Sequence, residues 1–103
     1  MDSPVLVTGA TGVVGSATCA LLRSSGFDVV GLSSSDADLR NFAEVREVFD
    51  RVSPVAIIHL AGRVAGIMGN IESQGSMYFD NLLINTNVIE AARLSHVRKI
   101  VAT

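Results

Sequence analysis

The stretch that decides the fold is residues 5–15, VLVTGATGVVG, near the start of the 103-residue sequence. It opens with a short apolar, β-branched run, which is typical of a strand buried on both faces. Three glycines follow, and the apolar spacing of residues 13–25 then predicts a helix that stops at Gly26. The face of this helix expected to be apolar carries Val14, Ala17, Leu21 and Leu22. Strand, glycine loop and helix in this order predict the first part of a β–α–β unit.

Further short apolar runs at residues 28–32, 55–60 and 99–102 are also predicted as strands. Strands that are apolar on both faces and separated by helices indicate a parallel sheet covered on both sides. We therefore predict an α/β fold, a Rossmann-type doubly wound parallel sheet that is incomplete, with about four strands, and truncated at its C-terminal side. The ligand crevice of such a sheet lies at the carboxyl ends of its strands.

Two more helices are predicted. Residues 41–44, NFAE, have the pattern of a capping box, and apolar residues at helical spacing follow until Ser53 and Pro54 end the helix. A glycine-rich stretch at residues 61–75 then leads to the longest expected helix, residues 77–94.

The three glycines of the loop have separate expected roles. Gly9 permits a sharp turn, Gly12 lets the backbone approach a ligand, and Gly15 allows the helix to pack closely. The helix N-terminus presents backbone N–H groups and the positive end of its dipole, which suits the pyrophosphate of a dinucleotide. The alternative interpretation is a tight structural turn in an unrelated α/β domain.

Composition excludes several other classes of protein. The net charge of −2 and the absence of a Lys/Arg cluster argue against nucleic acid or an anionic membrane as a partner. A lone cysteine, Cys19, indicates a reducing compartment, and no apolar run is long enough to span a bilayer. With no signal peptide apparent, we expect a cytoplasmic location.

The spacing Gly-x-x-Gly-x-x-Gly, preceded by Thr8, resembles that of the extended short-chain dehydrogenases/reductases that act on nucleotide sugars. Residues 58–70, IHLAGRVAGIMGN, and residues 81–92, NLLINTNVIEAA, look like the corresponding segments of GDP-L-fucose synthases, the GDP-4-keto-6-deoxymannose epimerase-reductases. The similarity covers the whole chain but only the first part of that family's architecture. Residues 1–103 are therefore expected to be the N-terminal part of an NAD(P)-binding Rossmann domain.

The resemblance implies that residues 9–15 bind the pyrophosphate, that Asp38 and Leu39 lie by the adenine, and that residues 60–62 line the ribose side. It also implies that Asn81 supports the active-site geometry. In the loop after the second strand, serines replace the family's frequent arginine and no acid ends the strand, which favours NADP with NAD as the alternative. The expected cofactor-binding residues are Gly9, Ala10, Thr11, Gly12, Val13, Val14, Gly15, Ser33, Ser34, Ser35, Asp38, Leu39, Leu60, Ala61 and Gly62.

No catalytic residue is assigned within this sequence. The superfamily uses a Ser or Thr and a Tyr-x-x-x-Lys pair, whereas the one tyrosine here, Tyr78, is followed four residues later by Leu82. We expect Tyr78 to be a packing residue, and the catalytic segment and sugar-binding domain to belong to a full-length parent. That parent is expected to be a homodimer that takes a nucleotide sugar, and the 103-residue chain is expected to be inactive alone.

Other tempting residues have structural interpretations. His59 is expected to be a satisfied core residue, His96 a surface residue and Cys19 a small buried filler, and no metal site is assigned. GDP-fucose formation by the parent is the leading function. The alternatives are another nucleotide-sugar epimerase or dehydratase of the same superfamily, and a non-catalytic dinucleotide sensor.

Overall fold

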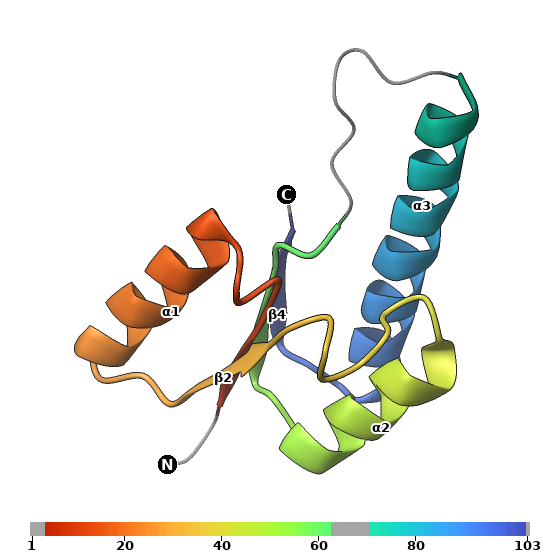
Figure 1. Cartoon of the computed structure of the whole chain (residues 1–103). Helices are drawn as coiled ribbons and strands as arrows, with labels where there is room; N and C mark the ends of the chain where they lie inside the picture. The colour runs from red at the N-terminus through yellow and green to blue at the C-terminus, as the bar shows by residue number, and fades with distance from the viewer. Residues whose placement is uncertain (1–3, 63–70, 103) are drawn as a thin grey trace.

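The computed structural model describes residues 4–62 and 71–102. Strands and helices alternate along the described chain (Figure 1). The elements in order are β1 (Val5–Thr8), α1 (Val13–Ser24), β2 (Val29–Leu32), α2 (Phe42–Val52), β3 (Ala56–His59), α3 (Ile71–Leu94) and β4 (Lys99–Ala102). The predicted α/β fold is confirmed, and residues 63–70 of the expected glycine-rich stretch lie outside the described residues.

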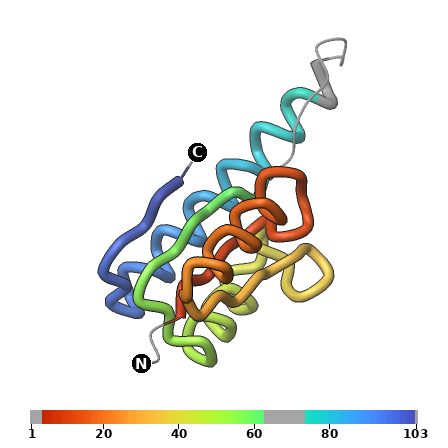
Figure 2. The backbone as a smooth tube through the Cα atoms, turned by 90° about the vertical axis from the view of Figure 1, so that its left-hand side faces the viewer, coloured from red at the N-terminus to blue at the C-terminus, as the bar shows by residue number. Residues whose placement is uncertain are grey.

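The described strands form one parallel sheet of four strands in the order β2-β1-β3-β4. Val5 of β1 is in register with Val29 of β2 on one side and with Ala56 of β3 on the other. Figure 2 shows β4, at the blue end of the chain, running alongside green β3. The chain passes from β1 to β2 on one side of β1, and then returns to β3 on the other side of β1. The direction in which strands are added therefore reverses between β1 and β3. A reversal of this kind places a crevice at the carboxyl ends of these two strands.

Helices cover both faces of the sheet, with α1 on one face and α2 and α3 together on the other (Figure 1). Side chains alternate along β1, so that Val5 and Val7 pack with Cys19 of α1. Leu6 points to the opposite face and joins the larger core, which includes Phe49 of α2. Because β1 is buried on both faces, its continuous apolar character follows directly from its place in the sheet.

The face of α1 that packs on the sheet is not the face expected from the sequence. Val14 and Leu21 are 64% and 68% exposed, whereas Gly15 and Cys19 are buried. Gly15 sets this orientation because it is the residue at which the helix approaches the preceding loop most closely. The helix ends one residue earlier than predicted, and Gly26 follows its end with φ of 94°. The N–H of Gly26 donates to the carbonyl oxygen of Arg23, and the N–H of Phe27 donates to that of Leu22.

The starts of the other two helices differ from the prediction in detail. Asn41 caps α2 as expected, accepting from the N–H groups of Ala43 and Glu44. Glu44 instead accepts from the N–H of Asp38 at 2.9 Å, because the N–H of Asn41 is already bonded to the Asp38 carbonyl oxygen. The last helix, α3, begins at Ile71, six residues before the expected position 77, so residues 71–75 are helical and not loop. Gly75 is tolerated there at a cost of about 1 kcal/mol relative to alanine. Within the described residues, no helix is long and apolar enough to cross a membrane.

Candidate functional site

The principal cleft of the described chain opens at the carboxyl ends of β1 and β3, where the strand order reverses. Its volume is about 820 Å³, which falls in the range of sites for cofactor-sized ligands. Its walls come from the glycine loop, the segment after β2 and the segment after β3. The lining residues are Gly9, Thr11, Gly12, Val13, Val14, Gly15, Leu32, Ser33, Ser34, Ala37, Asp38, Leu39, Arg40, Leu60, Ala61, Gly62 and Ile84.

Thirteen of the expected cofactor-binding residues thus surround one cleft, and Ala10 and Ser35 do not line it. A Cβ atom on Gly31 would lie 2.9 Å from the Ala10 Cβ, so the Ala10 side chain lies against β2. The Oγ of Ser35 lies 2.8 Å from the Oγ of Ser33, so Ser35 contacts a lining residue of the cleft. Arg40 is a lining residue that sequence reasoning missed.

The glycine loop is shaped by contacts that differ from one glycine to the next. Gly9 has φ of 67°, and a Cβ there would lie 2.9 Å from the backbone nitrogen of Ala61. A Cβ on Gly15 would overlap the carbonyl oxygen of Gly9, so this glycine packs against the loop itself. A Cβ on Gly12 meets only the Gly9 carbonyl oxygen, at an ordinary 3.5 Å. The protein therefore requires glycine at positions 9 and 15, whereas Gly12 leaves open the space in front of the helix N-terminus.

Helix α1 begins at this opening, and the residues of its first turn, Val13, Val14 and Gly15, line the cleft. Gly12 is the N-cap and supplies no side-chain cap, and the first turn, all of it described, contains no acidic residue. The N–H donors and the positive end of the helix dipole are therefore available to an anion. Val13 is 91% exposed beside them, and it gives the cleft an apolar wall.

A buried chain of hydrogen bonds supports the floor of the cleft. Thr8 Oγ1 accepts from the N–H groups of Leu60 and Ala61 at 2.9 and 3.0 Å. Both of its lone pairs are then used, so its own hydrogen goes to His59 Nδ1 at 2.7 Å. The other ring nitrogen of His59 lies 2.8 Å from Asn85 Oδ1 and carries the ring hydrogen that it donates there. This network joins β1, β3 and α3, and it confirms His59 as a satisfied core residue.

Burial lowers the pKa of His59 below its ordinary value, and the hydrogen bond to Asn85 acts in the opposite, weaker direction. The neutral ring matches the donors and acceptors around it, because protonation would direct a hydrogen at the Thr8 hydroxyl, whose lone pairs are occupied. His59 therefore acts in the fold of the cleft floor and does not line the cleft.

The serine loop after β2 is folded by Asp36. The Asp36 carboxylate accepts from the backbone N–H of Ser33 at 2.7 Å and from the Ser33 hydroxyl at 3.0 Å. These two hydrogen bonds, the backbone one first, lower the pKa of Asp36 and keep it ionised. Ser34 is exposed and lines the cleft. Among the described residues, no hydrogen bond joins it to Asp36 as those of Ser33 do.

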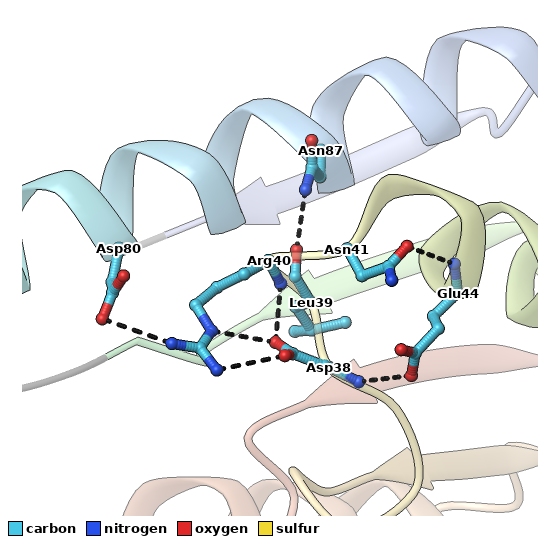
Figure 3. Close-up of polar contacts among 7 residues, drawn as sticks. All are labelled: Asp38, Leu39, Arg40, Asn41, Glu44, Asp80 and Asn87. Carbon is cyan, nitrogen blue, oxygen red and sulfur yellow. Dashed lines mark hydrogen bonds and ion pairs between the residues drawn. The ribbon is translucent and has the colours of Figure 1, made fainter.

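The far wall is the segment of Asp38, Leu39 and Arg40, shown in Figure 3. The Leu39 side chain is buried in the larger core, while the side chains on either side of it line the cleft and pair with each other. Arg40 donates from Nε and Nη2 to the two oxygens of Asp38, at 3.0 and 3.1 Å. The guanidinium lowers the pKa of Asp38, so a carboxylate stands at this wall.

Other residues considered in the sequence lie away from the cleft. Cys19 is buried, and His96 is exposed, both as predicted. Tyr78 is 71% exposed on α3, so the expectation of a packing role was wrong. Asn81 lies near Gly62, since a Cβ on that glycine would be 3.3 Å from Asn81 Oδ1. Among the described residues, no group of three or more His, Cys, Asp or Glu side chains could hold a metal ion.

A parallel sheet with a glycine turn at its switch point, and a cofactor-sized cleft above it, define a nucleotide-binding α/β domain. Residues 5–103 match the NAD dependent epimerase/dehydratase family, and the chain belongs to that family. A probable GDP-L-fucose synthase of Drosophila melanogaster is 38% identical over 101 residues, covering 95% of this chain and 32% of that protein. A GDP-L-fucose synthase of Dictyostelium discoideum is 35% identical with the same coverage, 95% and 32%.

Among solved structures, a GDP-L-fucose synthetase from Naegleria fowleri bound to NADP superposes with a TM-score of 0.87 at 31% identity. That match covers 98% of this chain and 33% of the other. The chain thus spans about a third of the length of the relatives it matches. The family resemblance seen in the glycine loop and in residues 81–92 is confirmed by these comparisons.

Proposed function

We propose that this chain is the dinucleotide-binding portion of an NADP-dependent nucleotide-sugar epimerase-reductase of the GDP-L-fucose synthase type. The observation that carries the proposal is the geometry around Gly12. The loop is fixed by Gly9 and Gly15, and it leaves an open approach to the donors of the α1 N-terminus. A pyrophosphate is an anion suited to that position, because backbone N–H groups and the helix dipole both favour it.

The two halves of the dinucleotide would extend from the pyrophosphate along the cleft. The adenosine half would pass Ser33 and Ser34 toward Asp38 and Leu39, and the other half would pass residues 60–62. NADP is favoured over NAD because β2 ends at Leu32 without an acid, and the exposed residue Ser34 offers a hydroxyl in the cleft wall. The Naegleria fowleri relative, whose structure holds NADP, supports the same choice.

The substrate and the catalytic residues would belong to the rest of the parent protein. We propose a homodimeric parent that converts a 4-keto-6-deoxy GDP-sugar to GDP-fucose, with residues 1–103 as the N-terminal part of its Rossmann domain. The relatives named GDP-L-fucose synthase support this substrate class.

Isothermal titration of the chain with NADPH and NADH tests the proposal. We expect saturable binding of NADPH at one site, weaker binding of NADH, and competition by ADP, which shares the pyrophosphate and adenosine groups. Absence of saturable binding by either dinucleotide would show that the cleft is not a dinucleotide site.

A further inference from the structure

We propose that Arg40 is a positioning residue for the adenine end of this site, where it holds the carboxylate of Asp38 in place to accept the adenine amino group. The inference rests on the proposed function, since it presumes a dinucleotide in the cleft. Arg40 and Asp38 both line the cleft on its far wall. Adenine carries an exocyclic amino group that donates hydrogen bonds, and an ionised carboxylate is an acceptor only.

Three donors of Arg40 fix the orientation of the Asp38 carboxylate. Nε and Nη2 of Arg40 hold its two oxygens, and the backbone N–H of Arg40 donates to Oδ1 at 3.0 Å. A carboxylate has about four acceptor positions, so these bonds leave it able to accept one more. Two parallel hydrogen bonds from a guanidinium also restrict the plane of the carboxylate, which a single contact would not.

Helix α3 holds the other side of this arrangement (Figure 3). Arg40 Nη1 lies 3.7 Å from Oδ2 of Asp80, a residue buried on α3. Between the two paired residues, the carbonyl oxygen of Leu39 accepts from Asn87 Nδ2 at 3.0 Å, also from α3. The segment is therefore attached to the helix at two points, and the Asp38 carboxylate takes its position from both.

The charges at this wall favour an indirect role for Arg40 over direct binding of a ligand anion. Its guanidinium bridges the carboxylates of Asp38 and Asp80, and both raise its pKa, Asp38 more strongly. A ligand phosphate beside Arg40 would also lie close to these two carboxylates, which repel an anion.

The test compares NADPH with deamino-NADPH, which carries hypoxanthine and so has a carbonyl oxygen where adenine has the amino group. The variants are Arg40→Gln, Asp38→Ala and the double variant. Arg93→Gln is the matched control, because Arg93 forms a similar paired contact with Glu90 on α3 but does not line the cleft. Dissociation constants come from calorimetric titration, and circular dichroism reports the fold.

We expect the unmodified chain and Arg93→Gln to prefer NADPH by about tenfold, as one charge-assisted hydrogen bond provides. Asp38→Ala should abolish the preference, and Arg40→Gln should reduce it to about threefold or less because the carboxylate is no longer held. The double variant should match Asp38→Ala, since Arg40 acts through Asp38. Arg40→Lys should restore part of the preference, because it keeps the charge without the paired geometry.

Several results would overturn the inference. One is an Arg40→Gln variant that weakens both dinucleotides equally and keeps the preference, which would indicate direct contact with a ligand anion. Another is binding without any adenine preference in the unmodified chain. If Arg40→Gln fails to fold, Asp80→Asn tests the same link and should lower the preference partially; an unchanged preference would contradict it. Failure of the proposed function looks different, because the unmodified chain would then bind neither dinucleotide.

Discussion

The hydroxyl of Thr8 donates to Nδ1 of His59 at 2.7 Å, and this contact fixes which nitrogen of the ring carries the hydrogen. Thr8 Oγ1 already accepts from two backbone N–H groups of the segment after β3. The neutral ring with its hydrogen on Nε2 is therefore the form of His59 that satisfies all its neighbours.

This relationship predicts an acid-sensitive fold. Burial lowers the pKa of His59 from 6.5, so below about pH 6.5 the unfolded chain takes up a proton that the folded chain does not. The free energy of unfolding should be at its full value above that pH, and fall as the pH drops toward the lowered folded pKa. Thermal denaturation measured across this window is the check. His96→Gln, at the exposed histidine, should keep the loss, and a His59→Gln variant that keeps it as well would refute the assignment.

The same network predicts the effect of removing one hydroxyl. Thr8→Val keeps the shape of the side chain but leaves the partly buried N–H groups of Leu60 and Ala61 without their acceptor. We expect the free energy of unfolding to fall by about 2 kcal/mol or more, since each unsatisfied buried group costs about 1–3 kcal/mol. Chemical denaturation measures this loss. Thr8→Ser retains the hydroxyl and should lose clearly less, and equal losses in the two variants would point to packing as the cause.

The geometry of the glycine loop predicts that substitution of Gly12 impairs ligand binding, whereas substitution of Gly15 impairs stability. Gly12→Val should keep the melting temperature close to that of the unmodified chain, because a Cβ there makes only an ordinary contact. Its NADPH binding should fall at least about tenfold, because the side chain occupies the approach to the helix N-terminus. Gly15→Ala should instead lower the melting temperature, because its Cβ overlaps the Gly9 carbonyl oxygen. Calorimetric titration and thermal melting of both variants provide the measurement. Unchanged NADPH binding by Gly12→Val would remove the loop from the site.

The Asp36 turn predicts how cofactor choice can be shifted. Its carboxylate occupies the N–H and hydroxyl of Ser33 and places a negative charge beside the cleft wall. Asp36→Asn should tighten NADPH relative to NADH by about threefold to tenfold, because a like charge near the 2′-phosphate is removed. Ser34→Asp adds a charge on the cleft side and should reverse the preference. The ratio of the two dissociation constants decides the matter, and tighter NADH than NADPH in the unmodified chain would contradict the NADP proposal.

The 103-residue chain should show no epimerase or reductase turnover. Tyr78 is the one tyrosine of the sequence, and Leu82 stands where the family's paired lysine would lie. Tyr78 is also exposed on α3 and does not line the cleft. Without a tyrosine whose pKa is lowered by a lysine, the acid/base step has no donor. NADPH oxidation in the presence of the keto-sugar is the assay, and turnover that Tyr78→Phe abolishes would show that this dismissal is mistaken.

Local patterns in the sequence predicted the sheet and most of the cleft. The apolar run before Gly9 and the glycine spacing indicated a buried strand and a turn, and both depend on neighbours within a few residues. The apolar residues of α1 predicted the wrong buried face, because their spacing does not show where the helix packs most closely. Gly15, which has no side chain to count, is the residue that determines how closely the helix approaches.

Contacts between distant residues could not be obtained in this way. In the sequence, Arg40 has the appearance of an ordinary loop arginine. Only the folded structure shows that Asp80 of α3 lies beside it. The hydrogen bond from the backbone N–H of Asp38 to the Glu44 carboxylate was missed for a related reason. The sequence pattern identifies a carboxylate at the third helical position but not which nearby N–H is still without an acceptor. The sequence does not reveal the early start of α3 at Ile71, because Gly75 is equally compatible with a loop and with the continuation of a helix.

The contact between Gly15 and Gly9 has a kinetic consequence. Because the turn is locked against the helix by its own backbone, the anion-binding surface is preorganised and needs little rearrangement when a ligand arrives. Association should then be limited mainly by diffusion and orientation, at about 10⁵–10⁷ M⁻¹s⁻¹. Differences in affinity among loop variants that keep this lock should appear almost entirely as differences in how long the dinucleotide stays bound.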